Sequence, residues 1–174
     1  DRTALTELLV ADLGKDAKLE PWDWWYYAEK VRKARYDLSQ DELKPYFQVD
    51  QVREGAFDVA GRLFGITFNE VTKDVPIYHE DVKAFDVKYA DGQHVGLLYV
   101  DYHPRAGKRG GAWMSEFRAQ SKIDGPVRPV IVNVGNFPAP AGDKPALLGW
   151  DEVQTLFHEF GHGFVGLADE YYTS

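Results

Sequence analysis

Residues 156–162 of the 174-residue chain, Leu-Phe-His-Glu-Phe-Gly-His, carry side chains whose types and spacing suit metal chemistry. His158 and His162 are four positions apart, so on a helix their imidazoles lie on one face, one turn above the other. Two imidazoles placed in this way can share one metal ion. Glu159 lies about 100° further round the helix, where its carboxylate can reach a water on that metal. The pattern predicts a zinc site with two ligands, a general base and an open coordination position.

The residues around this motif favour a helix. Asp151 and Glu152 open the segment, and Gly149 is a candidate cap with an acidic residue three positions later. An apolar stripe at helical spacing follows, made of Val153, Leu156, Phe157, Phe160 and Phe164. The alternative interpretation is a pair of histidines hydrogen-bonded in a core beside a solvated glutamate.

Composition limits the classes of protein that the chain can belong to. With 20 Lys and Arg against 28 Asp and Glu, the net charge is −8, which argues against a nucleic-acid partner because phosphate binding needs clustered cations. The chain has 0 Cys, so a metal would have to be held by His and carboxylate groups. No apolar run approaches membrane-spanning length, so no membrane partner is expected. The length predicts a single domain over residues 1–174.

The first third of the sequence predicts helices over residues 1–13, 22–36 and 50–64. The second of these begins with a cluster of aromatic side chains: Trp22, Trp24, Trp25, Tyr26 and Tyr27. So many aromatic residues on different sides of one helix indicate core packing. One wall of a substrate cleft is the alternative.

The middle of the sequence changes to the two-residue period of half-buried strands. Strands are predicted around residues 66–68, 85–89 and 94–102, with a hairpin turn at 90–93. A further strand is predicted over 126–133, where prolines mark an edge or the start of a strand. An exposed edge would let an extended peptide add to the sheet.

Two features of this middle region do not indicate a ligand site. The basic, glycine-rich loop 103–111 lacks the Gly-Lys-Ser/Thr ending of a phosphate-binding loop, so a flexible flap or surface loop is predicted. His79, His94 and His103 lack the spacing of metal ligands and are predicted to be exposed or hydrogen-bonded. Together the elements predict an α+β, zincin-like fold with N-terminal helices, a small mixed or antiparallel sheet and a C-terminal zinc-binding helix.

From about residue 21 to residue 162, roughly four-fifths of its length, the sequence resembles the thimet oligopeptidase and peptidyl-dipeptidase family of zinc peptidases. The motifs that carry the resemblance lie, in order, at residues 24–27, 43–47, 99–102, 105–114, 143–148 and 151–162. The resemblance implies a core that cleaves short peptides, with Zn²⁺ on His158 and His162 and catalysis by Glu159. It also favours a soluble, cytoplasmic protein.

Members of that family are much longer and take their third zinc ligand from a glutamate well downstream of the motif. This sequence has 12 residues after His162, and a truncated or engineered core is therefore one expectation. Residues 163–172 instead resemble the tail of IgA-peptidase-like metallopeptidases. In metzincin-type sites a glycine ends the helix and the third ligand follows three residues later. Asp169, three residues after Gly166, is the first candidate for that ligand.

Glu170 is the second candidate for the third ligand, and exposed tail acids are the alternative for both. Tyr171 or Tyr172 would be close enough in sequence to stabilise an oxyanion. The resulting hypothesis is a zinc metallopeptidase that hydrolyses short peptides, with Glu159 activating a zinc-bound water. The alternative is a catalytically inactive zinc-binding structural domain or engineered scaffold.

Overall fold

The computed structural model describes residues 2–36 and 40–165, and it divides the chain into two compact units, residues 1–45 and 46–174. The first unit contains α1 (Arg2–Leu13), a 3-10 turn (Pro21–Asp23) and α2 (Trp24–Tyr36), followed by the short α3 (Gln40–Leu43). These bounds confirm the first two predicted helices. None of the described helices combines the length and the apolar character needed to cross a membrane.

The small core of the first unit lies where α1 meets α2. Leu5 and Leu9 of α1 pack there with Tyr27 of α2. The core interpretation of the aromatic cluster is confirmed for Tyr27 and wrong for the other four members. These four are exposed by 41–78%: Trp22, Trp24, Trp25 and Tyr26.

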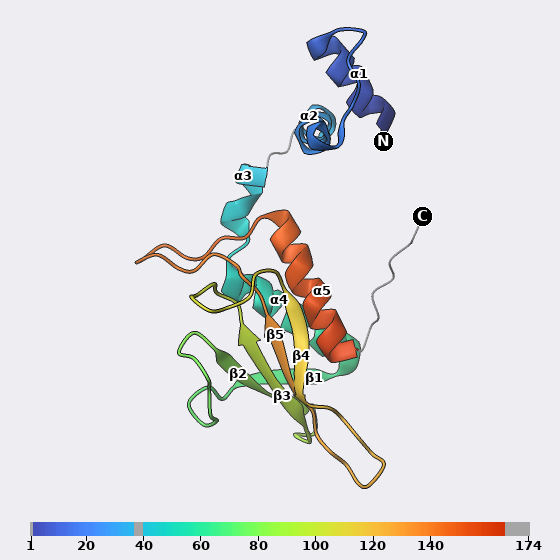
Figure 1. Ribbon diagram of the computed structural model, residues 1–174. Coiled ribbons are helices and arrows are strands. Elements are labelled where there is room, and N and C mark those ends of the chain that lie inside the picture. Colours follow the sequence, from blue (N-terminus) through green and yellow to red (C-terminus); the bar gives the residue numbers. More distant parts are fainter. Residues whose placement is uncertain (1, 37–39, 166–174) are drawn as a thin grey trace. The chain divides into compact units, whose positions relative to one another are not determined.

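The second unit is a five-stranded mixed sheet with two helices on one face (Figure 1). After a 3-10 turn (Lys44–Tyr46), the elements run as α4 (Val49–Phe64), β1 (Ile66–Glu70), β2 (Lys83–Tyr89), β3 (His94–Asp101), β4 (Trp113–Arg118), β5 (Val130–Val134) and α5 (Trp150–Val165). The strand order is β1-β2-β3-β5-β4. The β3–β5 pair is parallel and the other three pairs are antiparallel. The predicted α+β class and mixed sheet are therefore confirmed.

The edge of this sheet differs from the prediction. The prolines were predicted to mark an edge strand or the start of a strand. The edge alternative is wrong, because β5 lies between β3 and β4 and is buried on both faces. The other alternative is confirmed, because Pro129 directly precedes the first residue of β5. The prolines precede the strand, and the carbonyl of Pro129 accepts a hydrogen bond from Leu97 N. The true edge beside α5 is β4, which the sequence analysis missed. Its side chains from Ser115 to Arg118 are all exposed, so it lacks an alternating apolar pattern.

The main core lies between α4, α5 and one face of the sheet. Phe57 of α4 stacks on Phe68 of β1, with ring centroids 4.0 Å apart, and both rings also contact Phe160 of α5. Leu148, just before α5, is fully buried in the same core. These contacts fix α5 against the sheet, and the opposite face of the sheet is covered by a smaller cluster around Val82 and Tyr99. The single-domain interpretation of residues 1–174 stays a prediction.

Candidate functional site

Helix α5 carries the His-Glu-x-x-His motif and is held at both its start and its apolar face. At the start, the Glu152 carboxylate accepts a 2.7 Å hydrogen bond from Gly149 N, as predicted for a cap. Val153, Leu156 and Phe160 are buried in the main core. These three residues mark the inward face of the helix. The histidines lie outside that buried set: His158 is exposed and His162 is half-buried.

His158 and His162 converge on one side of α5. Their Nε2 atoms are 2.9 Å apart and their ring centroids 4.3 Å apart. Two nitrogens that bind one tetrahedral zinc at 2.0–2.1 Å are roughly 3.3 Å apart, so a small change in ring orientation would bring this pair to ligand geometry. Glu159, the next residue after His158, is half-buried. The chemistry and spacing of the two imidazoles therefore fit a shared metal ion.

The candidate third ligands and the two tyrosines predicted to stabilise an oxyanion belong to the C-terminal tail. Asp169, Glu170, Tyr171 and Tyr172 lie outside the described residues. Within the described parts of the chain, no group of three or more His, Asp or Glu side chains is arranged to hold a metal. The structure thus brings the two histidines together. Glu159 follows His158 on the same helix, and its catalytic role and the third ligand stay predictions.

A cavity of about 270 Å³ lies beside His162. Its wall combines His162 and Gly163 of α5 with the edge residue Glu116 and with Gly96 of β3. Gly96 lies against Pro129, and a Cβ on this glycine would come within 2.8 Å of the proline ring. The cavity therefore joins the histidine side of α5 to the edge strand β4.

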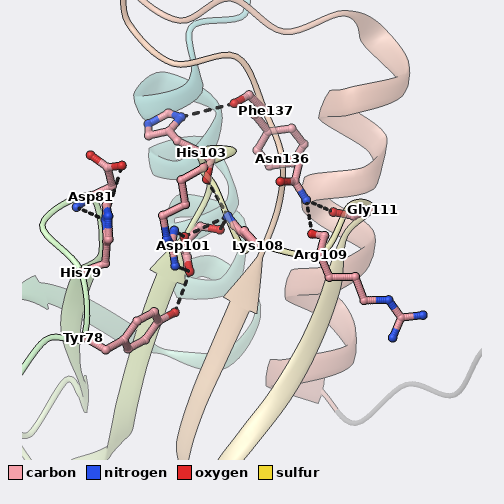
Figure 2. Close-up of polar contacts among 11 residues, drawn as sticks. Tyr78, His79, Asp81, Asp101, His103, Lys108, Arg109, Gly111, Asn136 and Phe137 are labelled. Atoms are coloured by element: carbon pink, nitrogen blue, oxygen red, sulfur yellow. Dashed lines mark hydrogen bonds and ion pairs between the residues drawn. The ribbon is translucent and has the colours of Figure 1, made fainter.

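The glycine-rich loop after β3 is anchored by a buried carboxylate (Figure 2). Asp101, only 2% exposed, accepts two hydrogen bonds from the Arg105 guanidinium, at 2.6 and 2.8 Å, and one from Lys108 Nζ at 2.9 Å. Tyr78 donates a fourth, at 2.8 Å. Burial acts to raise the pKa of Asp101, but the bonds from these donors outweigh it and lower that pKa to about 2.

The other end of this loop is held by Asn136, whose side-chain amide donates to the carbonyl oxygens of Arg109 and Gly111 at 2.9 and 2.7 Å (Figure 2). The cations of the loop that point inward are thus occupied by Asp101, which leaves them unsuited to cradle a phosphate. Most residues of the loop are exposed, so the structure favours the predicted surface loop over the predicted flexible flap. The sequence contained a hint of this anchor, because Asp101 ends an apolar strand and the cations Arg105 and Lys108 follow it closely in the chain.

The three scattered histidines are hydrogen-bonded, as predicted, and lie apart from the motif. Their Nδ1 atoms contact Asp81 N (His79, 3.2 Å), Asp86 Oδ1 (His94, 2.7 Å) and Phe137 O (His103, 3.4 Å). Sequence reasoning missed one further residue of the site, Asn133 of β5, because its contact with α5 joins residues 26 positions apart.

Comparison with known proteins agrees with the motif. A family model described as Peptidase family M3 matches residues 2–168. The dipeptidyl carboxypeptidase of Salmonella typhimurium is 49% identical over 150 residues, which cover 86% of this chain and 22% of the relative. Oligopeptidase A of Escherichia coli is 44% identical over 155 residues, covering 88% and 22%. Saccharolysin of Saccharomyces cerevisiae is 34% identical over 166 residues, covering 90% and 23%.

The chain thus spans 22–23% of the length of these relatives. The relatives carry the names of peptidases, and the predicted resemblance to the thimet oligopeptidase and peptidyl-dipeptidase family is confirmed. The chain belongs to peptidase family M3.

Proposed function

We propose that this chain forms the core of a zinc-dependent metallopeptidase that hydrolyses peptide bonds of short peptides. The observation that carries the proposal is the convergence of His158 Nε2 and His162 Nε2 to 2.9 Å on α5, with Glu159 between them in sequence. Membership of peptidase family M3 and the names of the relatives, a dipeptidyl carboxypeptidase and oligopeptidases, support it.

The two imidazoles would hold Zn²⁺, and Asp169 or, second, Glu170 would complete a three-ligand set. When bound, the metal would supply Lewis acidity for the scissile carbonyl and the attacking water. Glu159 would take a proton from that water and pass it to the leaving amine nitrogen. Tyr171 or Tyr172 would stabilise negative charge on the carbonyl oxygen.

The edge strand β4 and the cavity beside His162 offer a way to place the peptide. An extended peptide can pair with the outer backbone edge of β4, which no other described strand covers and which runs beside α5 (Figure 1). The 270 Å³ cavity between Glu116 and His162 would then receive one substrate side chain. The Glu116 carboxylate in its wall would favour a basic or hydrogen-bonding group there.

The experiment measures hydrolysis of a quenched short peptide by the full chain, with and without a chelator, together with zinc content. We expect chelation to stop cleavage and zinc to restore it. The Glu159→Gln variant should lose turnover while keeping its zinc, because the glutamate is assigned to proton transfer and not to metal binding. Equal rates with and without chelator would refute the proposal.

The second candidate function is a zinc-binding structural domain without catalysis. It is favoured by the arrangement of only two convergent ligands within the described residues. Zinc bound by the wild-type chain without any peptide cleavage would support this candidate over the first.

A further inference from the structure

Asn133 is a polar residue in β5, the most buried strand of the sheet, where it is the fourth of five residues. Its side chain is on the same face of β5 as Ile131, the face that packs against α5, and the residue is 2% exposed. Its amide nitrogen, Nδ2, donates a 2.8 Å hydrogen bond to the backbone carbonyl of Glu159. This bond ties the centre of the sheet to the residue between the two histidines of the motif.

The amide orientation at Asn133 follows from chemistry. A carbonyl oxygen can only accept, so the group that faces Glu159 O must be the NH₂. The other side-chain atom, Oδ1, is buried and accepts no hydrogen bond from any described residue. An apolar side chain of similar size would avoid that unsatisfied acceptor, so asparagine is a poor choice for packing alone.

The neighbouring glycine lets the helix come close enough for this bond. A Cβ on Gly163 would lie 3.1 Å from Ile131 Cγ2, 3.4 Å from Asn133 Nδ2 and 3.5 Å from Met114 Cε. The glycine, one turn after Glu159, therefore sits directly on the sheet. The close approach at Gly163 and the hydrogen bond at Glu159 together fix the distance between α5 and β5 and the rotation of α5 about its own axis.

We propose that Asn133 is a positioning residue for the motif helix, and this inference rests on the proposed function. Because His158, Glu159 and His162 project at fixed angles from the α5 backbone, any rotation of that helix redirects them together. The Asn133 bond holds the Glu159 peptide in one orientation. It thereby keeps the imidazole pair and the carboxylate aimed at the same point beside the cavity.

The test replaces Asn133 with leucine, which has the same branched shape at Cγ, a somewhat larger volume and no donor. We expect the Asn133→Leu chain to be at least as stable to urea as the wild type, since the unsatisfied Oδ1 is removed. Its dissociation constant for zinc, measured by competition with a chelating dye, should rise about tenfold or more, as for other residues that orient metal ligands. In the peptide assay kcat should fall while KM changes little.

The matched control is Val132→Ala, a buried residue on the opposite face of the same strand. This variant should lose stability but keep the zinc affinity and kcat of the folded wild type. The contrast separates positioning from a general weakening of the fold. Asn133→Leu with unchanged zinc affinity, or with a loss no greater than that of Val132→Ala, would overturn the proposal.

A metal-free measurement keeps the test decisive if the proposed function fails. Amide hydrogen exchange of the zinc-free chain should show faster exchange in α5 for Asn133→Leu than for the wild type, although global stability is maintained. Equal protection of α5 in the two chains would overturn the positioning role. A wild-type chain that binds zinc without cleaving peptides would refute the peptidase proposal alone.

Discussion

Replacing Asp101 with asparagine should remove the anchor of the loop that leads from β3 to β4. The carboxylate accepts four hydrogen bonds, and its pKa of about 2 lies nearly two units below the ordinary 3.8. At 1.36 kcal/mol per unit, the ionised form contributes about 2 kcal/mol to folding at neutral pH. The variant also leaves the Lys108 ammonium, 4% exposed, without a counter-charge. We therefore expect a total loss of about 3 kcal/mol.

Urea unfolding followed by circular dichroism measures this loss. The control is Asp58→Asn, which breaks an exposed pair with Arg62 on α4 and should cost about 0.5 kcal/mol or less. Similar midpoints for the Asp101 and Asp58 variants would refute the reasoning that burial makes the first carboxylate important.

The pH dependence gives an independent check of the Asp101 contribution. The folded pKa is lower than the unfolded one, so the stabilisation is fully present above about pH 4 and is lost as the pH falls toward 2. The asparagine variant has no charge to lose at this position. Its stability should therefore fall less between pH 4 and pH 2 than that of the wild type.

Three further substitutions test how α4 and α5 are held, each by urea unfolding of the full chain. Leu148→Ala should cost about 2–5 kcal/mol because it opens a cavity in the main core, and a cost below 1 kcal/mol would contradict that burial. Gly65→Ala should cost about 1 kcal/mol, since residue 65 ends α4 with φ 65°; an unchanged midpoint would contradict it. Glu152→Ala should cost about 1 kcal/mol by removing the cap at Gly149, and a neutral effect would show that the cap is dispensable.

The parts of the fold with strong local periodicity were predictable from the sequence. α4 and α5 carry apolar stripes at helical spacing. α4 begins within one residue of its predicted start and ends at its predicted last residue, and α5 begins one residue before the acids predicted to open it. β4 was missed because an edge strand exposed along most of its length needs no alternation of apolar and polar residues. For β5 the edge alternative was wrong, because prolines just before a strand and prolines within an edge strand give the same signal in the sequence.

In the candidate site, too, the contact within one helix was predictable and the contact between distant elements was not. The convergence of His158 and His162 follows from four-residue spacing on one helix, which is a local property. The hydrogen bond from Asn133 to Glu159 joins two elements that are distant in sequence, and no local pattern in either segment predicts it. The aromatic residues at the start of α2 were expected in a core because they are hydrophobic, but most of them are exposed. Hydrophobicity alone does not tell which neighbouring elements are available to cover a side chain.

The position of β5 between β3 and β4 also has a consequence for the order of folding. β4 precedes β5 in the chain, yet among the described strands β4 pairs only with β5, whereas β3 also pairs with β2. The antiparallel meander β1–β2–β3 can form from local contacts, whereas β4 has no partner until residues 130–134 arrive. Since α5 docks on β5 through Asn133, we expect the motif helix to be seated last, after the final strand has been inserted.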